Sequence, residues 1–284
     1  MTATEALQSA SQQLAADPHL ADNASRDAEL LLLHTLNITK VSFLANPARE
    51  LTPTQQQTYE AAITRRLRHE PIQYITGIQE FYGLPFRVTP AVLIPRPETE
   101  LLVEAVLSRL PHNHPLSIAD IGTGSGAIAI ALAAHLPHTT ITALDISPEA
   151  LAVAQSNAAA NNVTPRIRFL LSDLLAALPP LQQHAHFDVI VSNPPYVPLA
   201  EAADLHPQVR EHEPALALFA GSDGLDIYRR LIPQAQQALK PGGLLALEIG
   251  HGQQEIIAGL LSAWHGRTIL DDLHGIPRIA LARK

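Results

Sequence analysis

The sequence predicts an α/β protein in which a doubly wound, mostly parallel seven-stranded sheet follows a small all-helical domain and a β-hairpin linker. Up to about residue 70, apolar residues recur at helical spacing only. Between residues 73 and 94, aromatic residues and glycines are spaced as in strands and turns. After Pro115, strand-like and helix-like segments alternate to the end of the chain. Such alternation is typical of a mostly parallel sheet that is covered by helices on both faces.

The helical domain is expected over residues 1–72. Thr52 and Gln55 form the pattern of a capping box, with a proline at the first helical position between them. The apolar spacing behind this box predicts one amphipathic helix of a small bundle. Three arginines are expected on the outer side of this helix: Arg65, Arg66 and Arg68.

The hairpin linker is expected over residues 73–95 and the sheet domain over residues 96–284. A helix should begin near Pro97, with Glu98 and Glu100 at its positive end. The seven strands are expected at residues 117–121, 140–145, 167–171, 187–192, 244–249, 268–271 and 279–282. Ligands of such sheets bind at the carboxyl ends of the strands, so polar residues that follow a strand are candidate site residues.

The composition excludes several classes of protein. Of the 284 residues, 46% are hydrophobic and 16% are charged, which is ordinary for a globular protein with a sizeable core. The net charge of −8 argues against a general polyanion-binding surface. There is no cysteine for disulfide or thiol chemistry, and the first residues lack the basic and apolar parts of a signal peptide. We therefore expect a cytoplasmic protein that does not associate with a membrane.

A glycine-rich loop follows the first strand of the sheet and opens a helix. Glycines there let the backbone pass close to a ligand and expose N–H groups at a helix start. The same spacing also satisfies the pattern of a dinucleotide site, so the loop alone does not separate NAD from S-adenosylmethionine. The residues of this loop are Gly122, Thr123, Gly124, Ser125 and Gly126.

Acidic residues follow the next two strands. Asp145 ends the second strand, where a carboxylate can accept both hydroxyl groups of a ribose. Asp173 and Leu174 follow the third strand. Asp173 could accept the amino group of an adenine, or it could cap a turn or a helix. Asp145, like the glycine loop, suits either cofactor.

The fourth strand ends in Asn193-Pro194-Pro195-Tyr196. The two prolines cannot donate ladder hydrogen bonds and therefore stop the strand, and the residue before a proline is held extended. The side-chain oxygen of Asn193 and the carbonyl of Pro194 could each accept one hydrogen of a planar –NH2 group. Tyr196 would add an aromatic face. We expect all four residues to bind the substrate.

This arrangement favours methyl transfer over hydride transfer. A hydride-transferring enzyme needs an acid or base near the substrate carbonyl, and the tetrapeptide offers none. When both hydrogens of a weakly basic –NH2 group are bound, electron density rises on the nitrogen, and the transition state is stabilised more than the ground state. We therefore assign catalysis to Asn193 and Pro194 and expect S-adenosylmethionine, also in contact with Asn193, as the cofactor.

Other polar residues carry weaker signals. The histidine pairs His112/His114 and His184/His186 lie in expected loops, and without cysteine we expect no metal site. Glu248 ends the fifth strand, where its position alone favours a structural over a catalytic role.

Together these motifs resemble class I S-adenosylmethionine-dependent methyltransferases that modify planar –NH2 groups. Within that class the chain is most similar, almost end to end, to the protein-(glutamine-N5) methyltransferase family that modifies peptide chain release factors. The stretch Ile94-Pro95-Arg96-Pro97-Glu98-Thr99-Glu100 distinguishes it from sister enzymes that methylate a ribosomal protein. The resemblance implies that the glycine loop and Asp145 hold the cofactor, and that residues 193–196 hold the glutamine of a Gly-Gly-Gln tripeptide. Leu174 departs from the family, in which an aromatic residue often lies beside the adenine.

Three alternatives stay open on the sequence. A nucleic-acid amine methyltransferase could use the same tetrapeptide, but would need a basic recognition surface, which the net charge of −8 disfavours. A ribosomal-protein methyltransferase is disfavoured by residues 97–100, and a non-enzymatic scaffold by the intact Asn193 and Tyr196. We expect release factors as partners, with no membrane and no direct nucleic-acid substrate. Because a tripeptide is too small to identify a release factor, residues 1–72 are expected to be a substrate-docking domain.

Overall fold

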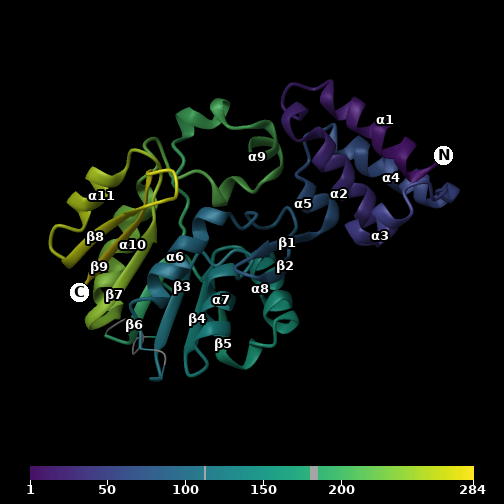
Figure 1. Cartoon of the computed structure of the whole chain (residues 1–284). Helices are drawn as coiled ribbons and strands as arrows, with labels where there is room; N and C mark the ends of the chain where they lie inside the picture. Colours follow the sequence, from purple (N-terminus) through teal and green to yellow (C-terminus); the bar gives the residue numbers. More distant parts are fainter. Residues whose placement is uncertain (112, 180–184) are drawn as a thin grey trace. The chain divides into compact units, whose positions relative to one another are not determined.

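The structure is a computed structural model that describes residues 1–111, 113–179 and 185–284 (Figure 1). It contains two compact units: Met1–Ile78 with Asp204–His212, and Gln79–Ala203 with Glu213–Lys284. The first unit is helical and the second contains the large sheet. Among the described residues, no helix combines the length and the apolar character that a membrane crossing requires.

The helical unit forms around the capping signals that the sequence contains. Thr52 Oγ1 accepts from the backbone N–H of Gln55, and Gln55 Oε1 accepts from that of Thr52, which confirms the capping box. Thr2 and Glu5 form a second capping box at the start of the chain. The helices of this unit are α1 (Ala3–Ala15), η1 (Ala21–Asn23), α2 (Ala24–Leu36), α3 (Lys40–Ala45), α4 (Pro53–Arg66), α5 (Ile72–Thr76) and α9 (Pro207–His212).

The prediction that Arg66 lies on the outer side of its helix is wrong, whereas Arg65 and Arg68 are exposed as expected. The side chain of Arg66 is 6% exposed, and its Nε donates to Asp27 Oδ2 of α2 at 2.7 Å. Its Nη2 donates to Gln208 Oε1 of α9 at 3.3 Å. Helical periodicity places a charged residue outside by default, and it cannot detect a distant acid that pairs with the charge once both are buried.

A hairpin forms between β1 (Ile78–Phe81) and β2 (Leu84–Arg87), inside the stretch 73–95 where the sequence predicts one. The first residues of that stretch are helical instead, because α5 continues to Thr76. Its turn residues Tyr82 and Gly83 both have positive φ, at 51° and 73°, as a two-residue hairpin turn requires. Phe81 and Phe86 are buried with their ring centroids 6.0 Å apart.

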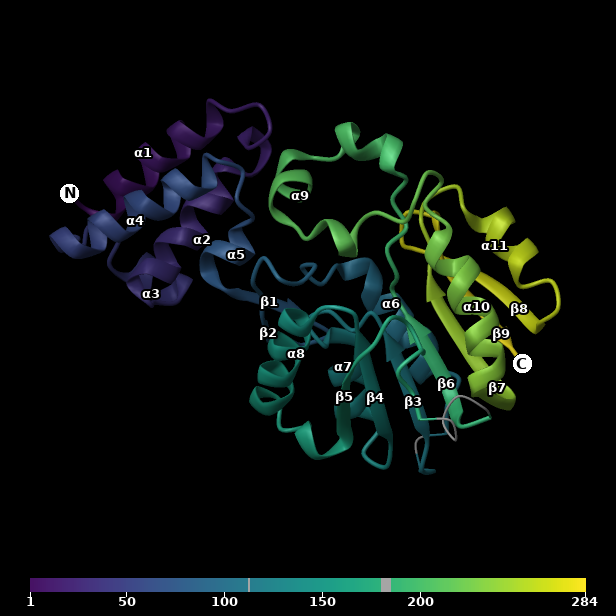
Figure 2. The same cartoon turned by 180° about the vertical axis from the view of Figure 1, so that it is seen from behind.

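The large sheet has seven strands in the order β5-β4-β3-β6-β7-β9-β8 (Figure 2). The first five of this order run parallel, and β9 is antiparallel to both β7 and β8. The predicted mostly parallel, seven-stranded sheet is therefore confirmed. Its strands are β3 (Ser117–Ile121), β4 (Thr140–Asp145), β5 (Ile167–Leu171), β6 (Phe187–Ser192), β7 (Leu239–Glu248), β8 (His265–Asp271) and β9 (Pro277–Arg283).

Helices cover both faces of this sheet, as expected of a doubly wound fold. Along the central strand β6, Val189 and Val191 belong to the core on one face and Ile190 to the core on the other. A strand that is buried on both faces reads as a continuous apolar run, which explains the residues before Asn193. The helices of this unit are α6 (Pro97–Leu107), α7 (Ala127–His135), α8 (Pro148–Ala160), η2 (Thr164–Arg166), η5 (Ala215–Ala217), α10 (Asp226–Ala238) and α11 (Gln254–Leu260), while η4 (Leu199–Asp204) ends at the first residue of the helical unit's second segment.

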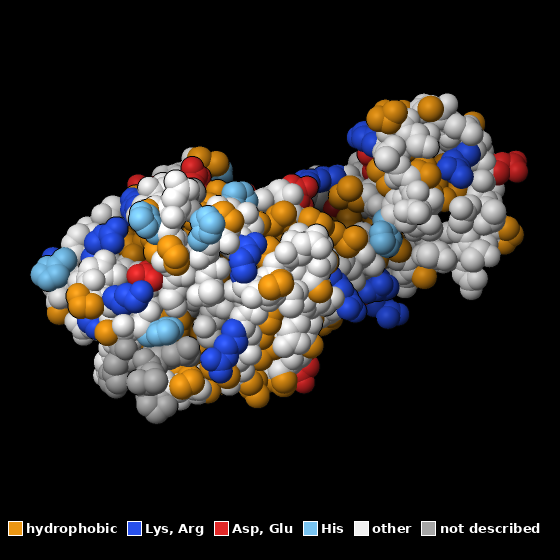
Figure 3. Space-filling view, turned by 90° about the horizontal axis from the view of Figure 1, so that it is seen from below, with side chains coloured by type: hydrophobic (Ala, Val, Ile, Leu, Met, Phe, Trp, Pro, Cys, Tyr) orange, Lys and Arg blue, Asp and Glu red, His pale blue; other side chains and the backbone are white. Residues whose placement is uncertain are grey.

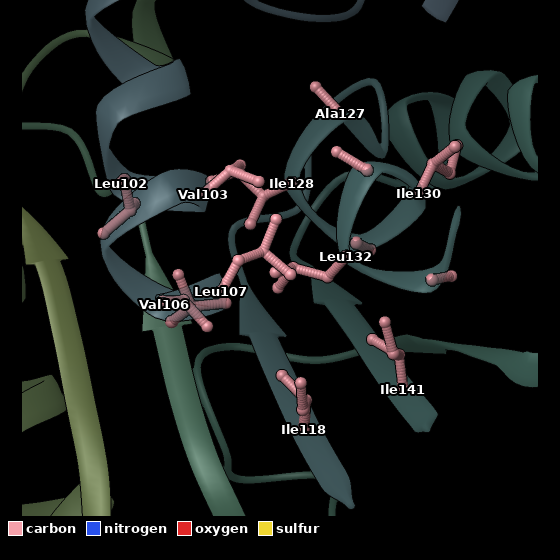
Figure 4. Close-up of a cluster of buried hydrophobic side chains, with 14 of the residues drawn as sticks. Leu102, Val103, Val106, Leu107, Ile118, Ala127, Ile128, Ile130, Leu132 and Ile141 are labelled. Atoms are coloured by element: carbon pink, nitrogen blue, oxygen red, sulfur yellow. The ribbon is translucent and has the colours of Figure 1, made fainter. Parts of the chain in front are cut away.

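The first core cluster is formed by α6 and α7 over β3 and β4. Figure 4 shows Leu102 and Val106 of α6 and Ile128 and Leu132 of α7 above Ile118 of β3. This packing fixes the start of α7, and with it the glycine loop that precedes the helix.

Candidate active site

A cavity of about 480 Å³ lies at the carboxyl ends of β3, β4, β5 and β6 in the sheet unit. The structure brings most of the predicted site residues together in its lining, but Gly126 and Tyr196 are not among the lining residues. The predicted residues that line it are Gly122, Thr123, Gly124, Ser125, Asp145, Asp173, Leu174, Asn193, Pro194 and Pro195.

The glycine loop is fastened to the neighbouring strand by its backbone. The N–H groups of Gly122 and Thr123 both donate to the carbonyl of Leu144, at 2.8 and 2.9 Å. A Cβ placed on Gly122 or Gly124 would meet no atom within 4 Å, so these glycines leave open space beside the cavity. Gly126 has a different role: with φ of 83°, its Cβ would lie 2.9 Å from Ile130 Cδ1 and 3.1 Å from Ala154 Cβ. Gly126 therefore permits close packing of the loop against α7 and α8.

Asp145 is held by the same loop and by the backbone just after β4. Its Oδ2 accepts from the N–H of Gly124 at 2.8 Å, and its Oδ1 accepts from the N–H of Ser147 at 2.9 Å. Burial raises the pKa of Asp145, and the backbone N–H groups oppose this shift. Each carboxylate oxygen can accept a further hydrogen bond, so the group can bind two ligand hydroxyls without losing its anchors.

Asp120 is a buried acid to which the sequence analysis assigned no role. Its Oδ2 accepts from Thr123 Oγ1 at 2.6 Å and from the N–H of Ala129 at 3.2 Å. Burial raises the pKa of Asp120 to about 7, and its Oδ1 has no hydrogen-bond partner within the described residues. Asp120 ties the loop to the first turn of α7. Its place immediately before the loop was the signal that could have identified it.

Asp173 and Leu174 line the cavity beyond β5. The Asp173 carboxylate accepts from Arg230 Nη2 at 2.5 Å, and both side chains are about half exposed. Leu174 has φ of 51°. It packs against the core cluster on the other face of the sheet, which includes Phe187, Ile190 and Tyr228 and is called the second core cluster below. The ion pair with Arg230 of α10 was not predicted, because 57 residues separate the two partners.

The Asn193 carboxamide is oriented by a residue from α6. Its Nδ2 donates to Thr99 Oγ1 at 3.0 Å, and Thr99 Oγ1 donates to Glu248 Oε2 at 2.7 Å. Glu248 is 1% exposed, and burial raises its pKa to about 7. Ser192 Oγ donates to the carbonyl of Ile121 at 2.7 Å, which fixes the end of β6 against β3.

Tyr196 faces the protein interior. Its ring packs against the second core cluster, and its hydroxyl lies 3.5 Å from Glu248 Oε1. The backbone carbonyl of Tyr196 accepts from Gln253 Nε2 at 3.0 Å. Burial raises the pKa of Tyr196. Its predicted contact with the substrate stays a prediction.

A rim of the cavity that the sequence did not suggest is formed by residues after Glu213. Glu213 is buried and accepts from Arg96 Nη2 at 2.5 Å and from the N–H of Ile94 at 3.3 Å. Leu216, 72% exposed, and Phe219 line the cavity behind it. The stretch that carried the family resemblance thus anchors this rim.

Metal binding is not indicated in the described part of the chain. Over residues 1–111, 113–179 and 185–284, no group of three or more His, Cys, Asp or Glu side chains could hold a metal ion. His112 and His184 lie outside the described residues. The expectation of no metal site therefore stays a prediction.

Comparison with known proteins identifies the family. Residues 5–77 match the family model of the PrmC N-terminal domain, and residues 98–208 match that of the methyltransferase small domain. The chain is 47% identical to a release factor glutamine methyltransferase of Koribacter versatilis, over 100% of this chain and 99% of the relative. It is 46% identical to one of Moorella thermoacetica, over 99% and 98% of the two chains.

A solved structure shares the fold. The T. thermophilus 16S rRNA N2 G1207 methyltransferase, in complex with AdoMet and guanosine, is similar with a TM-score of 0.54 and 22% identity, over 73% of this chain and 49% of that one. The end-to-end similarity to the curated relatives is decisive for the family. The chain belongs to the release factor glutamine methyltransferase family and is an S-adenosylmethionine-dependent methyltransferase.

Proposed function

We propose that this protein methylates the side-chain amide nitrogen, N5, of the glutamine in the Gly-Gly-Gln motif of peptide chain release factors. The observation that carries the proposal is that Asn193 and Pro194 line the same cavity as the glycine loop and Asp145. Their strands are neighbours in the sheet, because β3 pairs with β4 on one side and with β6 on the other. A methyl donor bound by the loop and an amide bound by Asn193 and Pro194, here called the amide clamp, would therefore meet within one cavity.

The residues of the loop fit S-adenosylmethionine, which supplies an electrophilic methyl group when it is bound. The open space beside Gly122 and Gly124 leaves room for a ligand against the backbone. Asp145, already anchored, can accept the ribose hydroxyls. Asp173 and Leu174 would contact the adenine. We assign cofactor binding to these residues together with Thr123, Ser125, Gly126 and Asn193, where Gly126 acts through packing.

The clamp acts on the amide rather than through a base. Asn193 Oδ1 and the Pro194 carbonyl would each accept one hydrogen of the substrate –NH2 group. This draws the nitrogen lone pair out of amide resonance and favours the pyramidal geometry of the transition state. The nitrogen would gain the methyl group as the sulfonium–methyl bond of S-adenosylmethionine breaks, leaving a neutral thioether, and would then lose one proton to solvent. Pro195 and Tyr196 would support the clamp.

The charge distribution supports a protein substrate over a nucleic acid. The net charge is −8, and on the face of the described residues in Figure 3 the Lys and Arg side chains stand in small separate groups. We assign recognition of the release factor to the helical unit, where residues 1–72 were expected to dock the substrate. Because release factors act on ribosomes, the enzyme should work in the cytoplasm.

The test is mass spectrometry of a release factor after incubation with the protein and S-adenosylmethionine. We expect one added methyl group on the glutamine of the tripeptide. A release factor with that glutamine changed to glutamate, which has no –NH2 group, should stay unmodified. Methylation of a ribosomal protein or of RNA in parallel reactions, with none on the release factor, would contradict the proposal.

A further inference from the structure

The carboxamide of Asn193 is the end of a hydrogen-bond chain that runs from the cavity into the core. Asn193 Nδ2 donates to Thr99 Oγ1 at 3.0 Å, and Thr99 Oγ1 donates to Glu248 Oε2 at 2.7 Å. The three residues come from the end of β6, from α6 and from the end of β7. All three lie in the sheet unit.

The chain has a direction that follows from the chemistry of its members. An ionised carboxylate can only accept hydrogen bonds, and a threonine hydroxyl has a single hydrogen to donate. Once that hydrogen is given to Glu248, Thr99 Oγ1 can only accept. Of the two ends of the Asn193 carboxamide, only the –NH2 end can then face Thr99. The oxygen Oδ1 is left for the cavity.

We propose that Thr99 and Glu248 are positioning residues that determine which end of the Asn193 carboxamide faces the substrate. This inference rests on the proposed function, in which Oδ1 must accept a hydrogen from the substrate amide. If the carboxamide were turned over, its Nδ2–H group would face the N–H of the substrate amide, and both groups are donors. The substrate –NH2 group would then lose one of its two acceptors.

The burial of Glu248 makes this hydrogen-bond chain sensitive to pH. Burial raises the pKa of Glu248 to about 7. A protonated Glu248 can donate to Thr99, which frees the threonine hydrogen for the oxygen of a turned carboxamide. The turnover rate should therefore be full when Glu248 is ionised and should fall as the pH drops below its pKa. Among the described residues, the titratable or charged groups that interact with Glu248 from the elements around it are Glu98 of α6, Tyr196 after β6, Tyr228 of α10 and Arg278 of β9.

The first test measures kcat, KM and cofactor affinity for two variants of Thr99. Thr99→Val keeps the shape but removes the hydroxyl, and we expect kcat to fall by ~10–100-fold, as for other residues that orient a functional side chain. The affinity for S-adenosylmethionine, measured by calorimetry, should fall much less than kcat, because the glycine loop and Asp145 are unchanged, and retained binding also reports that the variant is folded. Thr99→Ser restores the hydroxyl and should recover most of the rate. A kcat of Thr99→Val within about twofold of the wild type, or an equal loss in Thr99→Ser, would overturn the proposal.

The second test uses pH. In a plot of kcat against pH, the wild type should show an acid limb in which kcat falls below neutral pH. Glu248→Gln, whose side chain does not titrate, should lack this limb. The limb should also be absent in Thr99→Val, although Glu248 is intact there. Retention of the wild-type limb in both variants would assign it to another group and overturn the link.

The third test does not depend on activity. The side-chain –NH2 resonances of Asn193 in a ¹⁵N spectrum, identified by their loss in Asn193→Ala, should shift with pH in the wild type but not in Thr99→Val. If the wild type failed to methylate a release factor while these resonances still followed Glu248, the proposed function would be overturned and the chain of hydrogen bonds supported. Resonances that ignore pH in the wild type would overturn the inference itself.

Discussion

The two sides of the cavity are built in different ways. On the side proposed to bind the cofactor, the Asp145 carboxylate is held by backbone N–H groups of Gly124, 21 residues earlier, and of Ser147, two residues later. On the amide side, Asn193 is held by Thr99, 94 residues earlier in the chain, and Thr99 is held by Glu248, 149 residues later. The contacts of Asp145 span at most 21 residues and use backbone donors, whereas the contacts of Asn193 and Thr99 join side chains 94 and 149 residues apart. Binding and turnover should therefore respond separately to mutations on the two sides.

The largest expected effect is on the amide side. Asn193→Ala removes the side-chain acceptor, and the loss of one such oriented group should lower kcat by ~10²–10³-fold. Asn193→Asp should also be impaired, because a carboxylate has no hydrogen to donate to Thr99 Oγ1. Steady-state kinetics at saturating cofactor is the measurement. The matched control is Asn161→Ala, since Asn161 Nδ2 binds the carbonyl of Pro85 and does not line the cavity. Near-normal turnover of Asn193→Ala would remove the basis for the amide clamp.

A change on the cofactor side should alter affinity instead. Asp145→Ala removes the proposed acceptor of the ribose hydroxyls, and a hydrogen bond to a charged group contributes about 1.5–3 kcal/mol. We therefore expect the affinity for S-adenosylmethionine to fall at least ~10-fold, with a much smaller change in kcat at saturation. Calorimetry is the measurement.

Asp173→Ala is the matched control on this side. Its carboxylate is about half exposed and already paired with Arg230, so its removal should cost less affinity than the loss of Asp145. Unchanged affinity in Asp145→Ala, or a drop in kcat as large as that of Asn193→Ala, would break the distinction between the two sides.

The same contrast explains how much the sequence could predict. The glycine loop, Asp145 and the tetrapeptide after β6 are signals within short segments, and the structure places most of them around one cavity. Thr99 belongs to the stretch that carries the family resemblance, and the position of Glu248 alone favours a structural role. The hydrogen bond that joins them forms only when α6 packs beside β7 in the folded sheet unit. A contact between distant segments leaves no local pattern to detect.

Buried charges were missed for the same reason. Arg66 was expected on the outer side of its helix because helical periodicity shows where apolar residues lie. It does not show which distant residue pairs with a charged side chain. Asp27, 39 residues earlier, accepts its hydrogen bond and allows its burial. By contrast, the helices, the capping box at Thr52 and the strands were predicted from the spacing of their own residues.

A smaller effect is expected from the packing beneath the glycine loop. Gly126→Ala places a Cβ 2.9 Å from Ile130 Cδ1 at a φ of 83°, so we expect a loss of stability of about 1–3 kcal/mol. Cofactor affinity should fall because the loop moves, while kcat at saturation should change little. Chemical denaturation and calorimetry measure the two effects. Gly259→Ala is the control, because its Cβ would meet nothing within 4 Å and α11 should tolerate it. A kcat loss without an affinity loss would contradict the separation.

The smallest expected effect lies outside both sides of the cavity. Arg68 is an exposed residue after α4 of the helical unit, to which we assign release factor docking. Because an exposed charge contact contributes only about 0.2–1 kcal/mol, Arg68→Glu should raise KM for an intact release factor by ~2–5-fold and leave kcat unchanged. KM for a short Gly-Gly-Gln peptide should not change, since the peptide lacks the body that the helical unit would contact. The difference should shrink at high salt, where exposed charges are screened.

Arg267→Glu provides the matched control for this last variant. It makes the same change in net charge at an exposed residue of β8 in the sheet unit, so a general effect of charge on encounter with the substrate would appear in both variants. A KM increase confined to Arg68→Glu and to the intact release factor supports docking by the helical unit. An equal KM increase for the peptide would instead indicate that Arg68 affects binding in the cavity. An unchanged KM for both substrates would exclude Arg68 from recognition of the release factor.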